Sequence, residues 1–216
     1  MSELRFDGKV AIVTGAGLGI GRAVAIELAK RGARIVANDF SVTVNGEQYQ
    51  AARTVDQTVR EIIKLGGEAI ANYDTVLNGQ NIVNDAIQAW GRVDIVVNSA
   101  GFLKDGAFHK MTDKDWDMIH GVHLKGAFMT TRAAWPYMRS QKYGRVINIA
   151  SPAGIYGNFG QANYSAAKLG LHGFTNALSK EGASKNILVN TIAPLAATRM
   201  TIGKPCSCSF VLFISI

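Results

Sequence analysis

Tyr164 and Lys168 lie four residues apart in the segment Gln161-Ala-Asn-Tyr-Ser-Ala-Ala-Lys168, and Ser151 lies thirteen residues before the tyrosine. A phenol exchanges protons poorly at neutral pH, because its ordinary pKa is about 10. On a helix, a lysine at i+4 lies on the same face one turn away, and its positive charge favours the phenolate. The spacing therefore predicts that Tyr164 is a general acid/base whose pKa is lowered by Lys168, while Ser151 holds a substrate carbonyl or alcohol.

A buried tyrosine beside a solvated lysine would have the same spacing without any catalytic role. The amino-terminal part of the chain distinguishes the two interpretations. There the apolar run Val10–Val13 has the length and β-branching of a buried parallel strand, and a helical pattern follows from Ile20. Four glycines separate the two: Gly15, Gly17, Gly19 and Gly21. Glycines let the backbone approach a pyrophosphate, and the start of a helix supplies N–H donors and a positive dipole. The segment predicts a dinucleotide-binding turn.

Asp39 ends a second short apolar run, 24 residues after Gly15. A carboxylate at this position can accept hydrogen bonds from both adenosine ribose hydroxyls and would repel a 2′-phosphate. The glycine turn contains no Lys or Arg before Arg22 that could neutralise such a phosphate. We therefore expect NAD rather than NADP; the alternative, that Asp39 is a simple turn or cap residue, stays open.

Strand and helix patterns alternate along the chain, which predicts an α/β fold, a Rossmann-type doubly wound parallel sheet with helices on both faces. The expected strands are 9–14, 34–38, 68–73, 93–98, 145–150 and 187–192. The expected helices are 20–31, 53–65, 80–90, 113–140 and 161–183. At 216 residues with 48% hydrophobic residues, the chain suits one domain. We assign residues 1–201 to a dinucleotide-binding domain and residues 202–216 to an atypical apolar tail.

These features resemble the short-chain dehydrogenase/reductase family over residues 7–201. The matching residues are Thr14-Gly-Ala-Gly-Leu-Gly-Ile-Gly21, Asn98-Ser-Ala-Gly101, Ser151, Tyr164-Ser-Ala-Ala-Lys168 and Pro194. The resemblance implies that Tyr164 is the general acid/base, that Ser151 orients the substrate oxygen and that Lys168 also binds the nicotinamide ribose. It further implies that Pro194 and Thr198 lie near the nicotinamide and its carboxamide or phosphates. The other cofactor-binding positions that it implies are Ile20, Asp74, Asn98, Ala100, Gly101 and Tyr164.

Three further segments resemble one group within this family, the dehydrogenase units of peroxisomal multifunctional enzymes of fatty-acid β-oxidation, in their fungal form. The segments are Val122-His-Leu-Lys-Gly126, Ala133-Ala-Trp-Pro-Tyr-Met138 and the stretch from Ser151 to Tyr164. The resemblance implies NAD-dependent oxidation of (3R)-3-hydroxyacyl-CoA to 3-oxoacyl-CoA, a homodimer and a peroxisomal location, with the cytoplasm as the fallback. A hydroxysteroid dehydrogenase, a 3-oxoacyl reductase and a truncated, non-catalytic fragment stay open as alternatives.

His123 occupies the position at which most members of this family have an asparagine that holds a water molecule in a proton relay. One interpretation is that the imidazole replaces the amide and anchors this water near Lys168. The other is that His123 is bonded to a backbone carbonyl and has no chemical role. His120 is three residues away, but two histidines without a third ligand make a zinc site improbable, and we expect no metal.

Composition excludes several classes of function. The net charge is +7, yet Lys and Arg are scattered over the chain rather than gathered in the basic stripe of a nucleic-acid-binding protein. No apolar run is long enough to span a bilayer, and Ser2–Lys9 is too charged for a signal peptide. Both cysteines, Cys206 and Cys208, lie in the tail and form no disulfide framework. The expected partner is a small-molecule substrate, an acyl-CoA or a steroid.

The tail differs from the rest of the chain. After Thr201, a member of the family continues into substrate-loop helices, a further strand and a subunit-contact helix, whereas residues 202–216 match none of these. We therefore expect the fold to lack its last strand and substrate-loop helices. The run Phe210–Ile214 either adds an edge strand to the sheet or is exposed and prone to aggregation.

Overall fold

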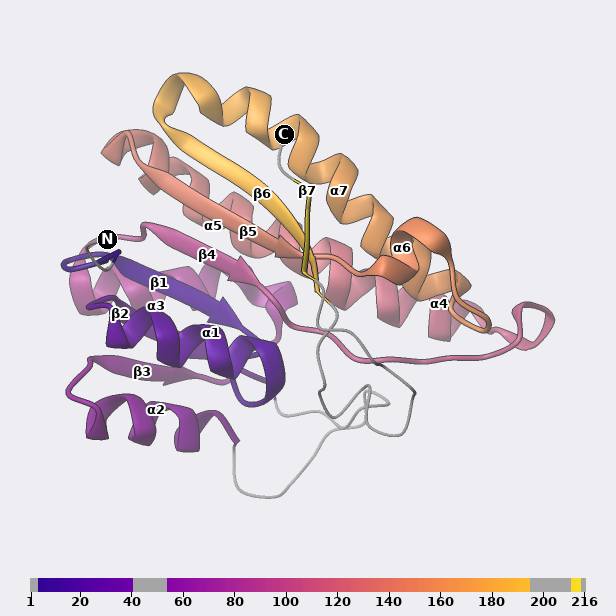
Figure 1. Cartoon of the computed structure of the whole chain (residues 1–216), viewed down its shortest axis with the longest axis horizontal. Coiled ribbons are helices and arrows are strands. Elements are labelled where there is room, and N and C mark those ends of the chain that lie inside the picture. Colours follow the sequence, from indigo (N-terminus) through magenta and orange to yellow (C-terminus); the bar gives the residue numbers. More distant parts are fainter. Residues whose placement is uncertain (1–3, 41–53, 195–210, 215–216) are drawn as a thin grey trace.

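The computed structural model describes residues 4–40, 54–194 and 211–214. In these residues, seven strands form one sheet of order β3-β2-β1-β4-β5-β6-β7 (Figure 1). The strands are β1 (Val10–Thr14), β2 (Arg34–Asn38), β3 (Ala69–Asn72), β4 (Ile95–Asn98), β5 (Gly144–Ile149), β6 (Ile187–Pro194) and β7 (Val211–Ile214). Strands β1 to β6 are parallel, and β7 pairs antiparallel with β6. The strand order reverses between β1 and β4, which is where doubly wound sheets bind their ligands.

Helices cover both faces of this sheet. They are α1 (Gly19–Lys30), α2 (Thr54–Lys64), α3 (Gly79–Trp90), α4 (Asp113–His120), α5 (Gly126–Gln141), α6 (Pro152–Tyr156) and α7 (Ala162–Gly182). Successive residues of β1 face opposite sides: Val10 and Ile12 pack with residues of α3 and α5, and Ala11 and Val13 pack with residues of α1 and α2. The predicted doubly wound α/β fold is confirmed.

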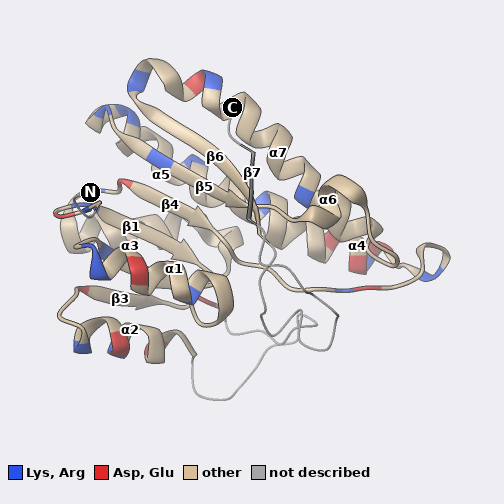
Figure 2. Ribbon diagram, in the orientation of Figure 1, with Lys and Arg blue, Asp and Glu red and all other residues tan. Residues whose placement is uncertain are grey.

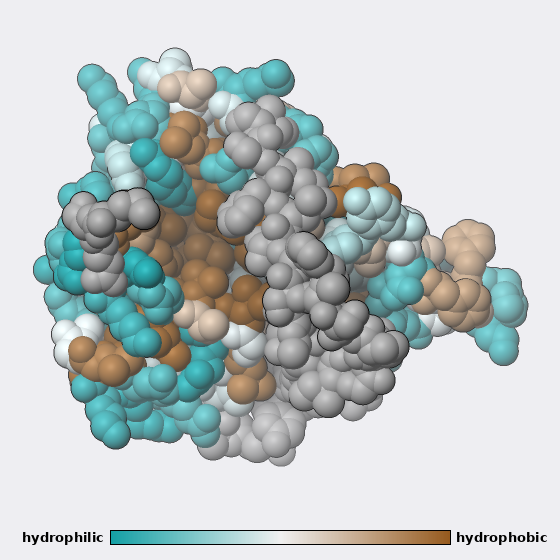
Figure 3. All heavy atoms as spheres, in the orientation of Figure 1, coloured by the Kyte–Doolittle hydropathy of each residue, from teal (hydrophilic) through white to brown (hydrophobic). Residues whose placement is uncertain are grey.

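One part of the sheet is less covered than the rest. Every residue of β1 and β4 is buried, as in a parallel sheet with helices on both faces, whereas burial along β6 alternates and Leu188 is 47% exposed. The exposed positions of β6 lie on the face that α1 and α2 cover elsewhere, and none of the described helices lies over them. Figure 3 shows brown, apolar surface in the middle of this view.

Most predicted elements are confirmed to within a few residues, and Gly32, which follows α1, has a φ of 93°. The predicted helix 113–140 is wrong in one respect, because a π-helical turn at Gly121–Lys125 separates α4 from α5. A π turn adds one residue without a clear change in the apolar pattern, so the sequence did not show it. The short helix α6 was also missed. Of the two outcomes considered for the tail, an edge strand is present as β7.

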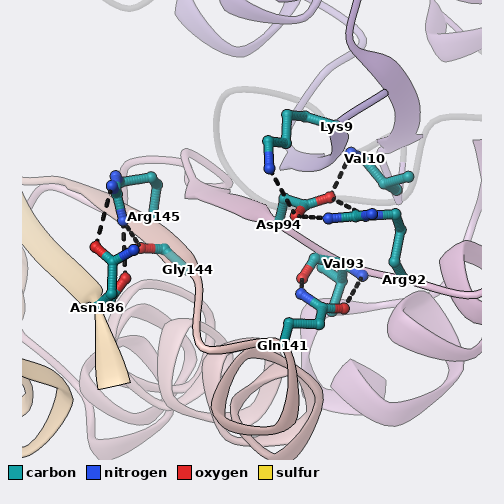
Figure 4. A network of polar contacts seen from close by, with 9 residues as sticks. All are labelled: Lys9, Val10, Arg92, Val93, Asp94, Gln141, Gly144, Arg145 and Asn186. Carbon is teal, nitrogen blue, oxygen red and sulfur yellow. Dashed lines mark hydrogen bonds and ion pairs between the residues drawn. The ribbon is translucent and has the colours of Figure 1, made fainter. Parts of the chain in front are cut away.

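A polar network closes the amino-terminal edge of the sheet (Figure 4). The fully buried carboxylate of Asp94 accepts hydrogen bonds from Arg92 Nε and Nη2, both at 2.7 Å, and from the Val10 backbone N–H at 2.9 Å. Lys9 Nζ lies 3.7 Å from the same carboxylate. These contacts fix the start of β1 against the start of β4, and they raise the pKa of the Arg92 guanidinium.

Candidate active site

The glycine turn that follows β1 leaves no room for side chains. Gly15 has a φ of 68°, and a Cβ on it would lie 2.8 Å from the Cα of Ala100. A Cβ on Gly21 would lie 2.3 Å from the carbonyl oxygen of Gly15. Helix α1 begins at Gly19, which has a φ of 59° and is followed by Ile20, with no acidic residue in its first turn and no side chain capping it. The turn therefore offers free backbone donors and close access, as a pyrophosphate requires.

Asp39 lies against this turn. Its Oδ2 accepts a hydrogen bond of 2.9 Å from the Gly17 backbone N–H, and a Cβ on Gly17 would lie 2.7 Å from the same oxygen. The carboxylate thus stabilises the turn, as in the alternative that the sequence left open. The ribose contact stays a prediction. Arg22, the nearest cation along the chain, is paired with Glu61 on α2.

Asp74 follows β3 and is surrounded by side-chain amides. Its carboxylate accepts from Asn72 Nδ2 and Asn81 Nδ2, each at 3.3 Å, and Asn72 also accepts a 2.8 Å hydrogen bond from Asn38 Nδ2. These asparagines connect the carboxyl ends of β2 and β3 to α3. The sequence pointed to Asp74 but missed the amides that orient it, since their partners are distant along the chain.

The predicted segment 98–101 lies at the carboxyl end of β4. The buried Asn98 side chain donates to Thr131 Oγ1 at 3.0 Å and to Asn148 Oδ1 at 2.8 Å, so it connects β4 to α5 and β5. The backbone N–H of Ala100 donates to Thr14 Oγ1 at 3.1 Å, which holds this segment against the end of β1. The side chain of Asn98 is therefore part of the framework, and its predicted contact with a cofactor stays untested.

The three predicted catalytic residues lie on neighbouring elements at the carboxyl edge. Ser151 follows β5 and caps α6, where its Oγ accepts a 3.2 Å hydrogen bond from the Ala153 N–H. Tyr164 lies in the first turn of α7, and Lys168 lies one turn further along. The buried Lys168 Nζ is 5.6 Å from the centroid of the Tyr164 ring and donates to the Ile149 carbonyl at 2.5 Å. The structure thus brings together all three.

Burial dominates the protonation of this pair. It raises the pKa of the Tyr164 phenol, and the nearby Asp105 carboxylate also raises it, whereas a hydrogen bond with Ser151 lowers it. Burial also lowers the pKa of Lys168 to about 7. The sequence predicted that Lys168 lowers the phenol pKa; burial acts in the opposite direction among the described residues, and the effect of Lys168 stays a prediction. The surroundings which disfavour a phenolate disfavour the ammonium as well.

His123 lies in the π-helical turn and is only 3% exposed. Its Nε2 is 2.8 Å from the Phe102 carbonyl oxygen and 3.2 Å from the Phe102 backbone nitrogen, and the shorter contact favours the tautomer with the proton on Nε2. Its Nδ1 is buried without a hydrogen-bond partner. Burial, and then the charge of Lys168, hold the pKa of His123 well below its ordinary value, so the ring is neutral.

These contacts bear on both interpretations of His123. The bond to Phe102 is the carbonyl contact of the structural interpretation, while the unpaired Nδ1 is an acceptor that a relay water would satisfy. The ring packs edge-on against Tyr164, with centroids 5.1 Å apart. A Cβ on Gly101 would lie 2.1 Å from His123 Cε1, so Gly101 provides the space for the imidazole.

The sequence did not predict a set of hydrogen bonds beside the candidate site, which we call the clamp and which is made by Gln161 and Asn163. The buried Gln161 donates from Nε2 to both Asp105 oxygens, at 3.0 and 3.2 Å. Asn163 Nδ2 donates to the Lys104 carbonyl at 3.1 Å. These bonds fasten the segment after β4 to the start of α7, directly before Tyr164. Gln161 and Asn163 stand in the catalytic motif of the sequence, but their partners come from another part of the chain.

The remaining predicted positions are at the margin of the described structure. Pro194 is the last residue of β6, and Thr198 lies outside the described residues. Within the described parts of the chain, no three His, Cys, Asp or Glu side chains are grouped closely enough to hold a metal ion. The helices found in those parts are too short or too polar to cross a membrane.

Comparisons with known proteins agree with this geometry. Residues 9–204 match the protein family described as short chain dehydrogenase. The peroxisomal hydratase-dehydrogenase-epimerase of Neurospora crassa is 55% identical over 199 residues, and the peroxisomal multifunctional enzyme type 2 of Mus musculus is 52% identical over 200. A crystal structure of a short chain dehydrogenase from Mycobacterium avium superposes with a TM-score of 0.82 at 40% identity, covering 90% of this chain and 70% of that one.

The two curated relatives are much longer than this chain. The match covers 92% of the chain but 22% of the Neurospora protein, and 93% of the chain but 27% of the mouse protein. The similarity therefore concerns one unit of each relative.

Proposed function

Because the chain belongs to the short-chain dehydrogenase family, we propose that it catalyses the NAD-dependent oxidation of (3R)-3-hydroxyacyl-CoA to 3-oxoacyl-CoA. The family and the relatives indicate a dehydrogenase that acts on a secondary alcohol. The acyl-CoA substrate is supported by the peroxisomal hydratase-dehydrogenase-epimerase and multifunctional enzyme to which the chain is similar. The observation that carries the proposal is the meeting of Ser151, Tyr164 and Lys168 at the carboxyl edge of the sheet, beside the glycine turn.

The residues of the glycine turn fit a dinucleotide. At Gly15 and Gly21 a Cβ would collide with the protein's own backbone, so these glycines keep the turn tight, and a pyrophosphate would lie at the start of α1, which no side chain caps. Asp39, which lies against the glycine turn, would accept from the adenosine ribose, and its charge would disfavour the 2′-phosphate of NADP. Arg22, the nearest cation along the chain, is already paired with Glu61 and so would not neutralise a 2′-phosphate, which supports NAD as the cofactor. NAD would supply the hydride acceptor at this site.

The protein's own residues would handle the proton. Tyr164 would remove it from the substrate hydroxyl in its phenolate form, which requires that the phenol first passes its own proton on, and Ser151 would donate a hydrogen bond to the same oxygen, which fixes the alcohol for transfer. Lys168, with a pKa of about 7, can hold or release a proton beside the phenol at neutral pH. The neutral His123 would bind a relay water through Nδ1, which has no partner among the protein groups. In this proposal His123 is a positioning residue.

The direct test is NADH formation, followed by absorbance at 340 nm, with purified protein and a pair of 3-hydroxyacyl-CoA substrates of opposite configuration. We expect turnover of the 3R substrate with NAD and little with the 3S substrate. Comparable rates with both, or a clear preference for NADPH-linked reduction of the ketone, would favour a 3-oxoacyl reductase or another activity of the family. A steroid alcohol in the same assay tests the hydroxysteroid alternative.

Two further proposals concern assembly and location. We propose a homodimer through a groove of about 630 Å³ on α4, α5 and α7, which is lined by apolar residues including Phe128 and Phe174 and has Asp117 and Lys125 on its wall. A two-fold contact would place these opposite charges against each other. Light scattering of the wild type and Phe128→Asp tests it, since a monomeric wild type contradicts it. The peroxisomal names of the relatives support a peroxisomal location, which imaging of a tagged protein would test.

A further inference from the structure

Three large aromatic side chains are exposed beside the candidate active site. Phe159 is 90% exposed, and Tyr156 and Phe108 are each 77% exposed. Single exposed apolar residues are common, but a group of large ones marks a binding surface. We name these three residues the aromatic rim. In Figure 3, the projecting end of the molecule has brown and tan spheres beside teal ones.

The aromatic rim comes from two segments that the fold holds together. Phe108 lies in the segment between β4 and α4, and Phe159 lies between α6 and α7. The Gly106 N–H donates a 2.8 Å hydrogen bond to the Gly160 carbonyl. Phe108 is two residues from Gly106 and Phe159 is next to Gly160, and each residue adds at most about 3.8 Å between Cα atoms. The backbone positions of the two phenylalanines are therefore near each other.

The aromatic rim is also continuous with the catalytic groups. Helix α6 begins directly after Ser151 and ends at Tyr156, and Tyr164 follows four residues after Gly160. Figure 1 shows α6 and the start of α7 beside the projecting segment that leads into α4. A substrate whose alcohol is held by Ser151 and Tyr164 can therefore extend its remaining atoms over the aromatic rim.

The charges next to the aromatic rim are mixed. Lys104 and Lys110 lie on the same segment as Phe108, together with Asp105, which accepts hydrogen bonds from Gln161, and Asp113 and Asp115 follow at the start of α4. Figure 2 shows basic and acidic positions along this projecting segment. Exposed aromatic rings beside lysines suit a molecule that has both a long aliphatic chain and a charged group.

We propose that the aromatic rim binds the aliphatic chain of the substrate and thereby selects long-chain over short-chain 3-hydroxyacyl thioesters. The inference rests on the proposed function and adds the chain length to it. Each methylene that leaves water on the rim strengthens binding, and the rings of Phe108 and Phe159 provide the area for several. The occupant is thus part of the substrate rather than a second copy of the chain.

The test compares chain lengths. We expect Phe159→Ser and Phe108→Ser to lower kcat/KM for a 12-carbon (3R)-3-hydroxyacyl-CoA about tenfold more than for the 4-carbon substrate. Leu188→Ser serves as the control, because Leu188 is an apolar, 47% exposed residue on β6 outside the rim, and it should leave the ratio of the two values unchanged. A ratio that is the same in the wild type and both rim variants overturns the inference.

A second measurement does not depend on turnover. Dodecanoyl-CoA binding, followed by calorimetry on the same proteins, should weaken about tenfold in Phe159→Ser and stay unchanged in Leu188→Ser. Equal affinity in all proteins overturns the inference even if the wild type oxidises its substrates. Weaker binding in the rim variants of a protein without dehydrogenase activity supports the rim and rejects the proposed function. Rim variants that only convert a dimer into a monomer identify the rim as a contact between copies, and the inference fails.

Discussion

Each edge of the parallel sheet contains a buried ionisable side chain, but the two side chains differ in how many hydrogen-bond and ion-pair partners they have. At the amino edge, the Asp94 carboxylate receives two guanidinium hydrogen bonds, one backbone N–H and a lysine. At the carboxyl edge, the Lys168 ammonium has a backbone carbonyl, and burial lowers its pKa to about 7. The unpaired nitrogen of His123 lies beside it.

The contrast separates stability from chemistry within one fold. A buried ion pair whose hydrogen bonds are satisfied fixes the positions of strands and is a poor proton carrier. A buried amine whose charge is only weakly compensated changes its protonation near neutral pH, which a proton-transfer site needs. In this molecule the first arrangement lies at the amino edge and the second at the carboxyl edge, where doubly wound sheets bind their ligands.

The largest expected effect is on kcat, and it should distinguish two tyrosines, one at each edge of the sheet, that each lie beside a lysine. Tyr164→Phe should lower kcat about 10³-fold or more, because it removes the proton acceptor, while NAD binding stays intact. Tyr143→Phe is the control, since Lys9 Nζ lies 3.9 Å from that ring at the amino edge, and it should leave kcat unchanged. The measurements are initial rates and NAD titration. Near-normal turnover by Tyr164→Phe would reject the catalytic assignment.

The second prediction concerns the amino edge. Asp94→Ala should reduce the free energy of unfolding by about 3–5 kcal/mol, because Arg92 and the Val10 N–H lose a buried partner. Asp7→Ala removes an exposed partner of Arg5 and should have a much smaller effect. Urea unfolding of the three proteins measures both. If the two substitutions destabilise equally, the buried network does not fix the edge as we infer.

The third prediction tests the charge at the carboxyl edge. The folded-state pKa of Lys168, about 7, is below the ordinary 10.5, so the unfolded chain binds more protons and the stability of the wild type rises between pH 7 and pH 10. Lys168→Met should therefore be more stable than the wild type near pH 6, by on the order of 3 kcal/mol, and the difference should shrink as the pH rises. Lys64→Met, at an exposed lysine of α2, is the control. A difference that does not change with pH contradicts the lowered pKa.

The smallest expected effect concerns the cofactor. Asp39→Ala should raise kcat/KM with NADP relative to NAD by roughly tenfold, because the repulsion of the 2′-phosphate is lost. Its contact with the Gly17 N–H is lost too, so affinity for NAD should also fall somewhat. Asp113→Ala, an equal change of charge at the start of α4, should leave the ratio unaltered. An unchanged NADP-to-NAD ratio in Asp39→Ala would assign Asp39 to the turn alone.

The strand pattern was predictable because it depends on neighbours along the chain. The apolar run of β1 and the glycine turn follow from local sterics and periodicity, and both are present. The split of the predicted helix 113–140 was not predictable, because the one extra residue of the π-helical turn leaves the apolar pattern without a clear change.

The sequence by itself determined the doubly wound fold and the helical spacing that puts Tyr164 and Lys168 on one helix, because both depend on residue types a few positions apart. Only the tertiary structure decided how these groups are protonated. Burial is the sum of contacts from distant segments, and it raises the pKa of Tyr164 while it lowers that of Lys168. The same holds for the clamp of Gln161 on Asp105, because hydrogen bonds between distant segments exist only after the strands have been ordered.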